Sequence, residues 1–174
     1  RLGRDSIGRS LREAGVLVPL VNRPDGVTVL LTQRTDHLAQ HAGQVAFPGG
    51  RREPGDPHLT ATALRETEEE IGLPRHQVEV IGELDIYETN SAYAITPVVG
   101  WIEPPFHLTV DPFEVADVFE VPLDFVLDPI NHRRESRLRN GIERRYYVLP
   151  YDSRYIWGAT AGMLVNLAGI LGRR

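Results

Sequence analysis

The sequence predicts an α+β fold in which helices and β-strands pack as a sandwich. Short apolar segments bounded by Gly, Pro and Asn predict strands, whereas a charged segment with capping residues and a terminal segment with apolar residues near helical spacing predict helices. These segments do not alternate in strict βαβ order, which argues against a doubly wound fold. The chain has 174 residues, 41% of them hydrophobic, as is typical of one globular domain with a sizeable core. We therefore expect residues 1–174 to form a single domain.

Two pairs of strands are predicted in the first part of the chain. Residues 16–21 and 27–34 are short apolar runs, and the Asn-Arg-Pro-Asp-Gly segment at 22–26 between them is a turn signal. Residues 78–87 and 93–101 have the same character and predict a second pair.

A charged helix is predicted between these two pairs, from about residue 57 to 71. A stretch rich in Gly and Pro precedes it. Asp56 is the predicted N-cap and Pro57 the first-turn residue, because these residue types favour those positions. Gly72 and Pro74 are expected to end the helix.

The remainder of the chain is predicted to mix strands with short helices. The expected elements are a Pro-rich loop at 103–113, a strand at 115–121, a short helix after Pro122, a hairpin with strands at 136–139 and 144–149 around Asn140-Gly141, and a terminal helix at 159–171.

Missing residue types exclude several chemistries. All 19 basic residues are Arg, and neither Lys nor Cys is present. The chain therefore has no Schiff-base lysine, phosphate-loop lysine, disulfide or thiolate nucleophile. A net charge of −5 and a pI of about 5.7 argue against a broad nucleic-acid or anionic-membrane surface. We expect a cytoplasmic protein with a small-molecule substrate and no nucleic-acid or membrane partner, because no membrane-length apolar run or signal-peptide pattern is visible. The oligomeric state stays open.

The charged helix carries acidic side chains at a spacing that predicts a metal site. Glu66 and Glu70 are four residues apart and share a face, and Glu69 borders that face. Like charges at this spacing cost roughly 0.2–0.5 kcal/mol per pair, and Arg65 cannot neutralise all three. A solvated helix face is one interpretation. The other is a hard divalent cation, Mg²⁺ or Mn²⁺, which oxygen ligands favour and which joins carboxylates to a phosphorylated substrate.

Residues 50–73 resemble the Nudix box, a motif that runs Gly-x5-Glu-x7-Arg-Glu-U-x-Glu-Glu-x-Gly-U, where U is a bulky apolar residue. Two features depart from it. Thr67 stands at a usually aliphatic position, and one extra residue separates Gly50 from Arg65, with Asp56 in the place of the early Glu.

Two upstream segments resemble the coenzyme A pyrophosphatase subfamily of Nudix hydrolases, which shares the lengthened box. They are Leu-Leu-Thr-Gln-Arg at 30–34 and Gly-Gln-Val-Ala-Phe-Pro-Gly-Gly at 43–50. Two residues depart from this signature. Thr35 stands where Ser or Ala is usual, and Ala39 stands where Arg is usual. The resemblance implies a Nudix-like α/β/α sandwich with a mixed sheet in a single domain.

The same resemblance implies an activity. It implies hydrolysis of the diphosphate of coenzyme A, or of a derivative, to 4′-phosphopantetheine or its acyl form and adenosine 3′,5′-bisphosphate, with Mg²⁺ or Mn²⁺ as cofactor. One alternative is another nucleoside diphosphate derivative, such as ADP-ribose or a dinucleoside polyphosphate. A second alternative is a Nudix module that senses a nucleotide without cleaving it.

Residue roles follow from the resemblance as expectations. Glu66 and Glu70 are the main metal ligands, and Glu69 is a ligand or the general base, directed by Arg65. Glu114 is a rival for the base. The expected substrate-binding residues are Arg34, Gly43, Gln44, Phe47, Gly49, Gly50, Arg51 and Arg52.

Overall fold

The computed structural model describes residues 10–172; the predicted domain also included residues 1–9 and 173–174, which lie outside the described residues. The strands are β1 (Arg12–Arg23), β2 (Gly26–Arg34), β3 (Val45–Ala46), β4 (Gly49–Arg51), β5 (Glu79–Glu83), β6 (Tyr87–Glu88), β7 (Tyr93–Ile102), β8 (Val115–Pro122), β9 (Arg133–Arg139), β10 (Ile142–Tyr151) and β11 (Arg154–Trp157). The α-helices are α1 (Leu59–Ile71), α2 (Leu123–Leu127) and α3 (Gly158–Leu171), and 3₁₀ turns span Arg75–Gln77 and Pro129–Asn131. Within residues 10–172, no helix is long and apolar enough to cross a bilayer.

The main sheet is mixed, as predicted. It has eight strands, with the path β3-β2-β1-β7-β5 and with β4 added to β1, β6 to β7 and β8 to β2. Strands β1 and β7 pair in parallel over ten residues, whereas β1 pairs with β2 and β4 in the antiparallel sense. A second, three-stranded sheet has the order β11-β10-β9.

One edge of β1 pairs with β7, and the opposite edge is shared by β4 and β2. Its first part pairs with β4, from Ala14 to Val16, and its last part pairs with β2, from Leu20 to Arg23. Between them, Leu17 donates its N–H to Pro48 O at 2.8 Å. Pro19, which has no N–H to donate, falls in the gap between the two partners, so a central strand tolerates a proline here.

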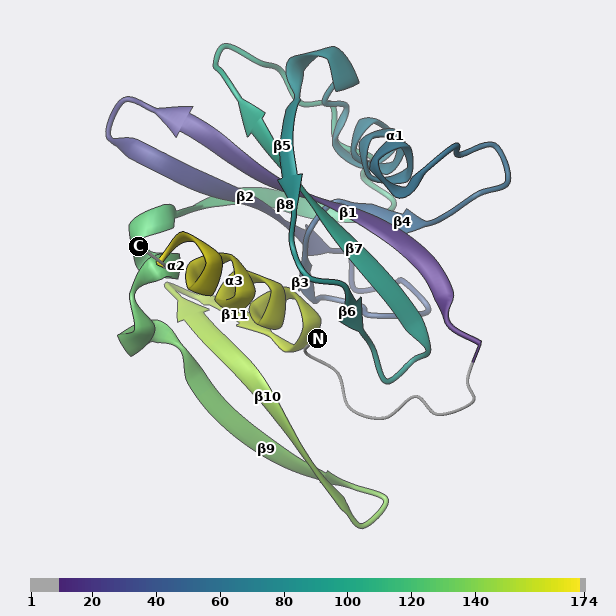
Figure 1. Cartoon of the computed structure of the whole chain (residues 1–174), viewed down its shortest axis with the longest axis vertical. Helices are drawn as coiled ribbons and strands as arrows, with labels where there is room; N and C mark the ends of the chain where they lie inside the picture. Colours follow the sequence, from purple (N-terminus) through teal and green to yellow (C-terminus); the bar gives the residue numbers. More distant parts are fainter. Residues whose placement is uncertain (1–9, 173–174) are drawn as a thin grey trace.

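Two apolar cores lie on the two faces of the sheet and confirm the α+β sandwich. Side chains alternate along β1 because a strand has a period of two. Leu17 and Val21 join the core that includes Ala63 of α1, whereas Val18 and neighbouring residues join the core that includes Leu164 of α3. In Figure 1, β1 and β7 run between α1 and α3.

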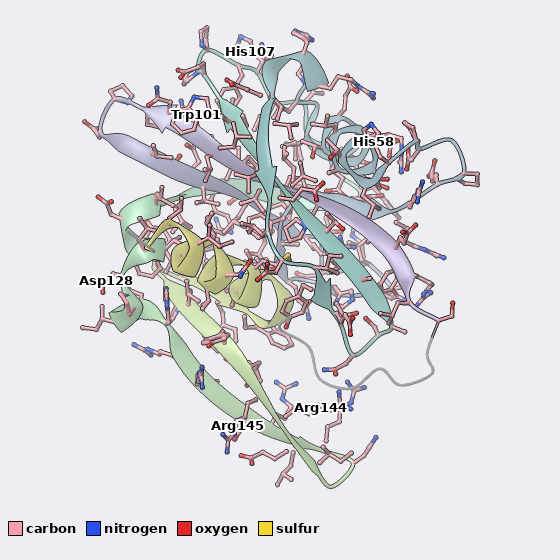
Figure 2. All side chains as sticks on the ribbon, viewed as in Figure 1. His58, Trp101, His107, Asp128, Arg144 and Arg145 are labelled. Carbon is pink, nitrogen blue, oxygen red and sulfur yellow. The ribbon has the colours of Figure 1, made fainter. Side chains whose placement is uncertain are left out.

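The start of α1 differs from the prediction, and the N-cap assignment to Asp56 is wrong. The helix begins at Leu59, and its N-cap is His58, whose Nδ1 accepts a hydrogen bond from Ala61 N at 3.1 Å. Figure 2 labels His58 beside α1. The Asp56 carboxylate instead accepts hydrogen bonds from three other groups, described below. The predicted C-terminus is confirmed, because Gly72 has a φ of 68° and donates to Glu68 O.

Two predicted strand segments have different bounds. The strand expected at 78–87 is broken into β5 and β6, with Leu84 N donating to Pro97 O between them. The hairpin around Asn140-Gly141 is longer than predicted. Strands β9 and β10 pair along their length, from Arg133 opposite Val148 to Arg139 opposite Ile142. Its exposed, Arg-rich β9 lacks the apolar alternation that marks a strand in sequence.

Candidate active site

Strand β4 places Gly50 against Glu66 of α1 and Gly49 against β1. A Cβ atom added to Gly50 would lie 2.6 Å from the Glu66 carboxylate, and one added to Gly49 would lie 2.5 Å from Gly15 O and from Val16 Cα. Only glycine permits these approaches. Gly49 therefore packs β4 closely on β1, and Gly50 brings the backbone of β4 against the Glu66 carboxylate.

Glu70 is a buried carboxylate at the centre of the site. It is 6% exposed, and a backbone hydrogen bond from Gly49 reaches it. Burial raises the pKa of Glu70 to about 8; the charges of Glu66 and Glu114 add to this shift, and Arg34 opposes it. Burial also raises the pKa of Glu66. The predicted pair Glu66 and Glu70 is thus brought together in a place that disfavours uncompensated negative charge.

Arg65 links the carboxylates, and its main partner is Asp56. Arg65 Nε and Nη2 each donate to Asp56 at 2.9 Å, whereas its Nη1 lies 3.2 Å from Glu66 and 3.3 Å from Glu69. Thr62 Oγ1 and Glu53 N also donate to Asp56 at 2.9 Å. The Arg65 guanidinium holds the pKa of Asp56 well below its usual range. The Glu69 side chain is 59% exposed, so it lies at the rim of the site.

The loop before β8 brings Glu114 to the helix. Thr109 N donates to Ile71 O at 2.9 Å, and Asp111 N donates to Glu70 O at 2.8 Å, which ties the loop to the last carbonyls of α1. Glu114 O then accepts from Thr35 N at 3.1 Å. This backbone route places Glu114 close enough to influence the pKa of both Glu66 and Glu70.

Arg34 lies at the same end of the sheet. In the β2–β8 ladder it pairs with Val115, next to Glu114. Its Nε is buried and has no hydrogen-bond partner among residues 10–172. A buried donor without a partner is costly, and a phosphate oxygen is a group that would satisfy it.

The segment before β3 is held next to the end of β2. Gln33 Nε2 donates to Gly43 O, and Arg34 N donates to Gln44 O at 2.9 Å. Gly43 has a φ of 69°, and a Cβ atom there would lie 2.7 Å from Asp36 Oδ1. Phe47 is 4% exposed and belongs to the core that includes Leu164 of α3.

The two arginines after the glycine pair have different surroundings. Arg52 donates to Glu13 at 2.7 Å and approaches the carbonyls of Asp56 and Pro57 at 3.3–3.4 Å. Arg51 is exposed, and its carbonyl accepts from Arg65 at 3.2 Å. Arg52 is therefore engaged in structural contacts, whereas the Arg51 side chain faces solvent.

These residues fit a hard divalent cation that shares its coordination with water and substrate. Among residues 10–172, no three His, Asp or Glu side chains form a ready-made metal cluster. The available donors are carboxylates. Burial raises the pKa of Glu66 and Glu70, and neighbouring carboxylates add to both shifts, as expected of ligands that need a cation. Mg²⁺ normally keeps several waters and uses only one or two carboxylates plus phosphate oxygens, so the absence of a closed cluster is compatible with it.

A family model described as NUDIX domain matches residues 11–139. The chain belongs to the Nudix hydrolase family. An "Uncharacterized Nudix hydrolase NudL" of Yersinia pestis (strain Pestoides F) is 43% identical over 157 residues, which cover 90% of this chain and 78% of that protein.

Solved Nudix structures share the fold. The Ap4A hydrolase binary complex of C. elegans has a TM-score of 0.55 at 18% identity. The match covers 64% of this chain and 80% of the hydrolase chain. The NUDIX domain of Shewanella oneidensis NrtR, complexed with ADP ribose, has a TM-score of 0.51 at 20% identity. The match covers 72% of this chain and 82% of the NrtR chain.

The structure shows how Thr67 and Asp56 are accommodated in the departures from the Nudix box. Thr67 is fully buried, and its hydroxyl donates to Ala63 O at 2.7 Å, so a polar side chain is satisfied at a usually aliphatic position. Asp56 takes the place of the early Glu and binds Arg65 directly. The sequence carried no signal for the hydrogen bond from Thr35 N to Glu114 O or for that from Arg154 to Gln33, because these partners lie far apart in the chain.

Proposed function

We propose that this Nudix hydrolase cleaves the diphosphate of coenzyme A or its derivatives, giving 4′-phosphopantetheine, or its acyl form, and adenosine 3′,5′-bisphosphate. The observation that carries the proposal is the gathering of Glu66, Glu70 and Glu114 with the unpartnered Arg34 Nε at one end of the sheet. The substrate assignment is supported by the subfamily signature at 30–34 and 43–50, which supplies the end of β2 and the loop and strands beside this cluster.

The side chains divide the work of hydrolysis. Glu66 and Glu70 would hold Mg²⁺ or Mn²⁺, which when bound screens the diphosphate charge and lowers the pKa of water. Arg34 would donate its Nε–H to a phosphate oxygen. The proton of the attacking water goes to Glu69 or Glu114, and both are kept as candidates. Glu69 is the one whose direction Arg65 sets, whereas Glu114 is held through its backbone.

Product analysis tests the proposal directly. Purified protein is incubated with coenzyme A and Mg²⁺ or Mn²⁺, in parallel with ADP-ribose and diadenosine tetraphosphate, and the products are separated by chromatography. We expect the two coenzyme A products to form at the highest kcat/KM. Preferred turnover of ADP-ribose or of the dinucleotide would assign the chain to a different Nudix substrate class.

Glu70→Gln separates a catalytic role from a structural one. We expect this substitution to lower kcat by about 100-fold or more while the protein stays folded, because it removes a charged metal ligand but keeps the shape of the side chain. Mg²⁺ should raise the melting temperature of the wild type and not that of the variant. Glu68→Gln is the matched control, since Glu68 lies on the same helix and its side chain pairs with the exposed Arg75. Wild-type turnover by Glu70→Gln would remove Glu70 from the site.

A nucleotide-sensing module is the second candidate. The observation that favours it is the fold shared with the ADP-ribose complex of the NrtR domain. Tight ADP-ribose binding without products, under conditions where metal is bound, would support sensing over hydrolysis.

A further inference from the structure

Phe113 is an exposed aromatic ring next to the predicted site residue Glu114. It is 64% exposed, and among the large apolar side chains of residues 10–172 that are exposed, only Phe113 and Tyr155 are aromatic. Tyr155 donates its hydroxyl to Glu135 at 2.9 Å. Phe113 has no polar group, so its ring face is left in water, and covering it with a ligand would be favourable.

The backbone that carries this ring is fixed on both sides. Phe113 O accepts from the buried Thr35 hydroxyl at 2.7 Å, and Phe113 N donates to Asp111 Oδ1 at 3.0 Å. Asp111 is itself tied to Glu70 O in α1. An exposed ring on a fixed backbone is preorganised for binding, because little further order has to be imposed.

A second ring stands beside Phe113. The His37 and Phe113 ring centroids are 4.8 Å apart with planes inclined at 56°, and His37 Nε2 lies 3.5 Å from the Thr35 hydroxyl. His37 follows β2, which ends at Arg34, and Phe113 and Glu114 precede β8, so the two rings lie at neighbouring strand ends. Together they offer an apolar face and a ring nitrogen at one corner.

The neighbouring charges define what such a ligand must contain. Arg34 pairs with Val115 in the β2–β8 ladder, and Thr35 N donates to Glu114 O at 3.1 Å, so the two rings lie beside the backbone that carries Arg34 and Glu114. A molecule that reached both would combine an anionic phosphate with a flat aromatic group. A nucleotide has this combination, and base–aromatic stacking is a common source of its affinity.

We propose that Phe113, flanked by His37, is the stacking site for the base of the nucleotide half of the substrate. The proposal rests on the function proposed above and adds the position of the base. The base stacks on the exposed face of Phe113, and His37 borders it with a ring nitrogen that can exchange a hydrogen bond.

Calorimetric binding of AMP tests this inference without catalysis, because AMP has no diphosphate to cleave. AMP and ribose 5-phosphate are titrated into the protein in the presence of Mg²⁺. We expect Phe113→Ala to weaken AMP binding by about tenfold, to leave ribose 5-phosphate binding unchanged, and Phe113→Tyr to retain wild-type AMP binding. Ile142→Ala is the matched control, because Ile142 is 58% exposed on the remote hairpin.

Three results would overturn the stacking site. They are wild-type AMP binding by Phe113→Ala, equal weakening of AMP and ribose 5-phosphate in that variant, and a wild type that binds AMP no more tightly than ribose 5-phosphate. A failure of the hydrolytic proposal is distinguished by the product assay, which reports cleavage independently of AMP binding.

Discussion

Arg65 donates hydrogen bonds of 2.9 Å from both Nε and Nη2 to the two carboxylate oxygens of Asp56, nine residues earlier. The side chains are 17% and 6% exposed. A bidentate pair in a largely buried position fixes the orientation of both groups. Because Arg65 also contacts Glu66 and Glu69, the pair sets the geometry of the carboxylate cluster from outside it.

Loss of the Asp56 charge should therefore affect both stability and activity. We expect Asp56→Asn to lower the free energy of unfolding by about 3 kcal/mol, because Arg65 would be left without its main partner in a buried position. Activity should fall as Arg65 turns away from Glu66. Urea unfolding and steady-state kinetics measure the two effects. Glu68→Gln removes an exposed pair with Arg75 and should cost less than about 1 kcal/mol; equal costs in the two variants would contradict this account.

A methyl group on Gly50 should disturb the site more than the fold. Its Cβ would lie 2.6 Å from the Glu66 carboxylate, which is the flexible end of that side chain and can move away. We expect Gly50→Ala to lower kcat by about 100-fold, as misplacement by 1 Å can. Thermal unfolding should change little. Gly55→Ala is the control, because nothing lies within 4 Å of a Cβ there. Full activity of Gly50→Ala would show that the close approach is irrelevant.

Arg154 on β11 is expected to hold the segment before β3, which carries Gly43 and Gln44, in place from the second sheet. It donates to Gln33 Oε1 at 3.2 Å and to Asp117, and Gln33 in turn donates to Gly43 O. Arg154→Ala should raise KM by about 2- to 10-fold, with kcat nearly unchanged, because a hydrogen bond of this kind contributes about 0.5–1.5 kcal/mol.

Arg145→Ala is the matched control for Arg154. Arg145 lies on the β9–β10 hairpin, away from α1 (Figure 2), and its ion partner Glu143 is 3.9 Å distant. We expect wild-type KM for this variant. A fall in kcat without a change in KM for Arg154→Ala would argue for a role in the reaction step instead of in loop position.

Glu120 should make stability depend on pH outside the active site. Hydrogen bonds from Arg23 hold its pKa below the usual range, and Thr28 also donates to it. A depressed folded pKa means that the carboxylate stabilises the fold above its unfolded pKa of about 4.3, and that this contribution is lost as pH falls through the lower, folded value. Urea unfolding of wild type and Glu120→Gln should differ by about 1 kcal/mol at pH 7, since Arg23 is 38% exposed.

The sign of the Glu120 effect provides its own check. The difference between the two proteins should shrink on acidification below about pH 4. A difference that grew at acid pH, or that stayed constant from neutral to acid pH, would be incompatible with a depressed pKa of Glu120.

The sequence predicted most of the fold because its signals are local. Strand segments such as 27–34, the end of α1 at Gly72 and the turn at Asn140-Gly141 are marked by periodicity and by Gly, whose effects act within a few residues. The predicted start of α1 was wrong. Asp56 has a residue type that favours the N-cap position, but its carboxylate binds Arg65 instead. Strands β3 and β4 were not predicted, because two or three residues in a Gly-rich stretch carry no pattern.

By itself, the sequence determined that Glu66 and Glu70 share a helix face and that Gly50 stands before that helix, because helical spacing and motif spacing are local properties. Only the tertiary structure decided which carboxylates are buried, that Glu69 stays at the rim, and that Glu114 joins Glu70. Those outcomes depend on backbone hydrogen bonds between the loop before β8 and the end of α1. Burial and charge proximity are set by packing between distant segments, and no spacing along the chain encodes them.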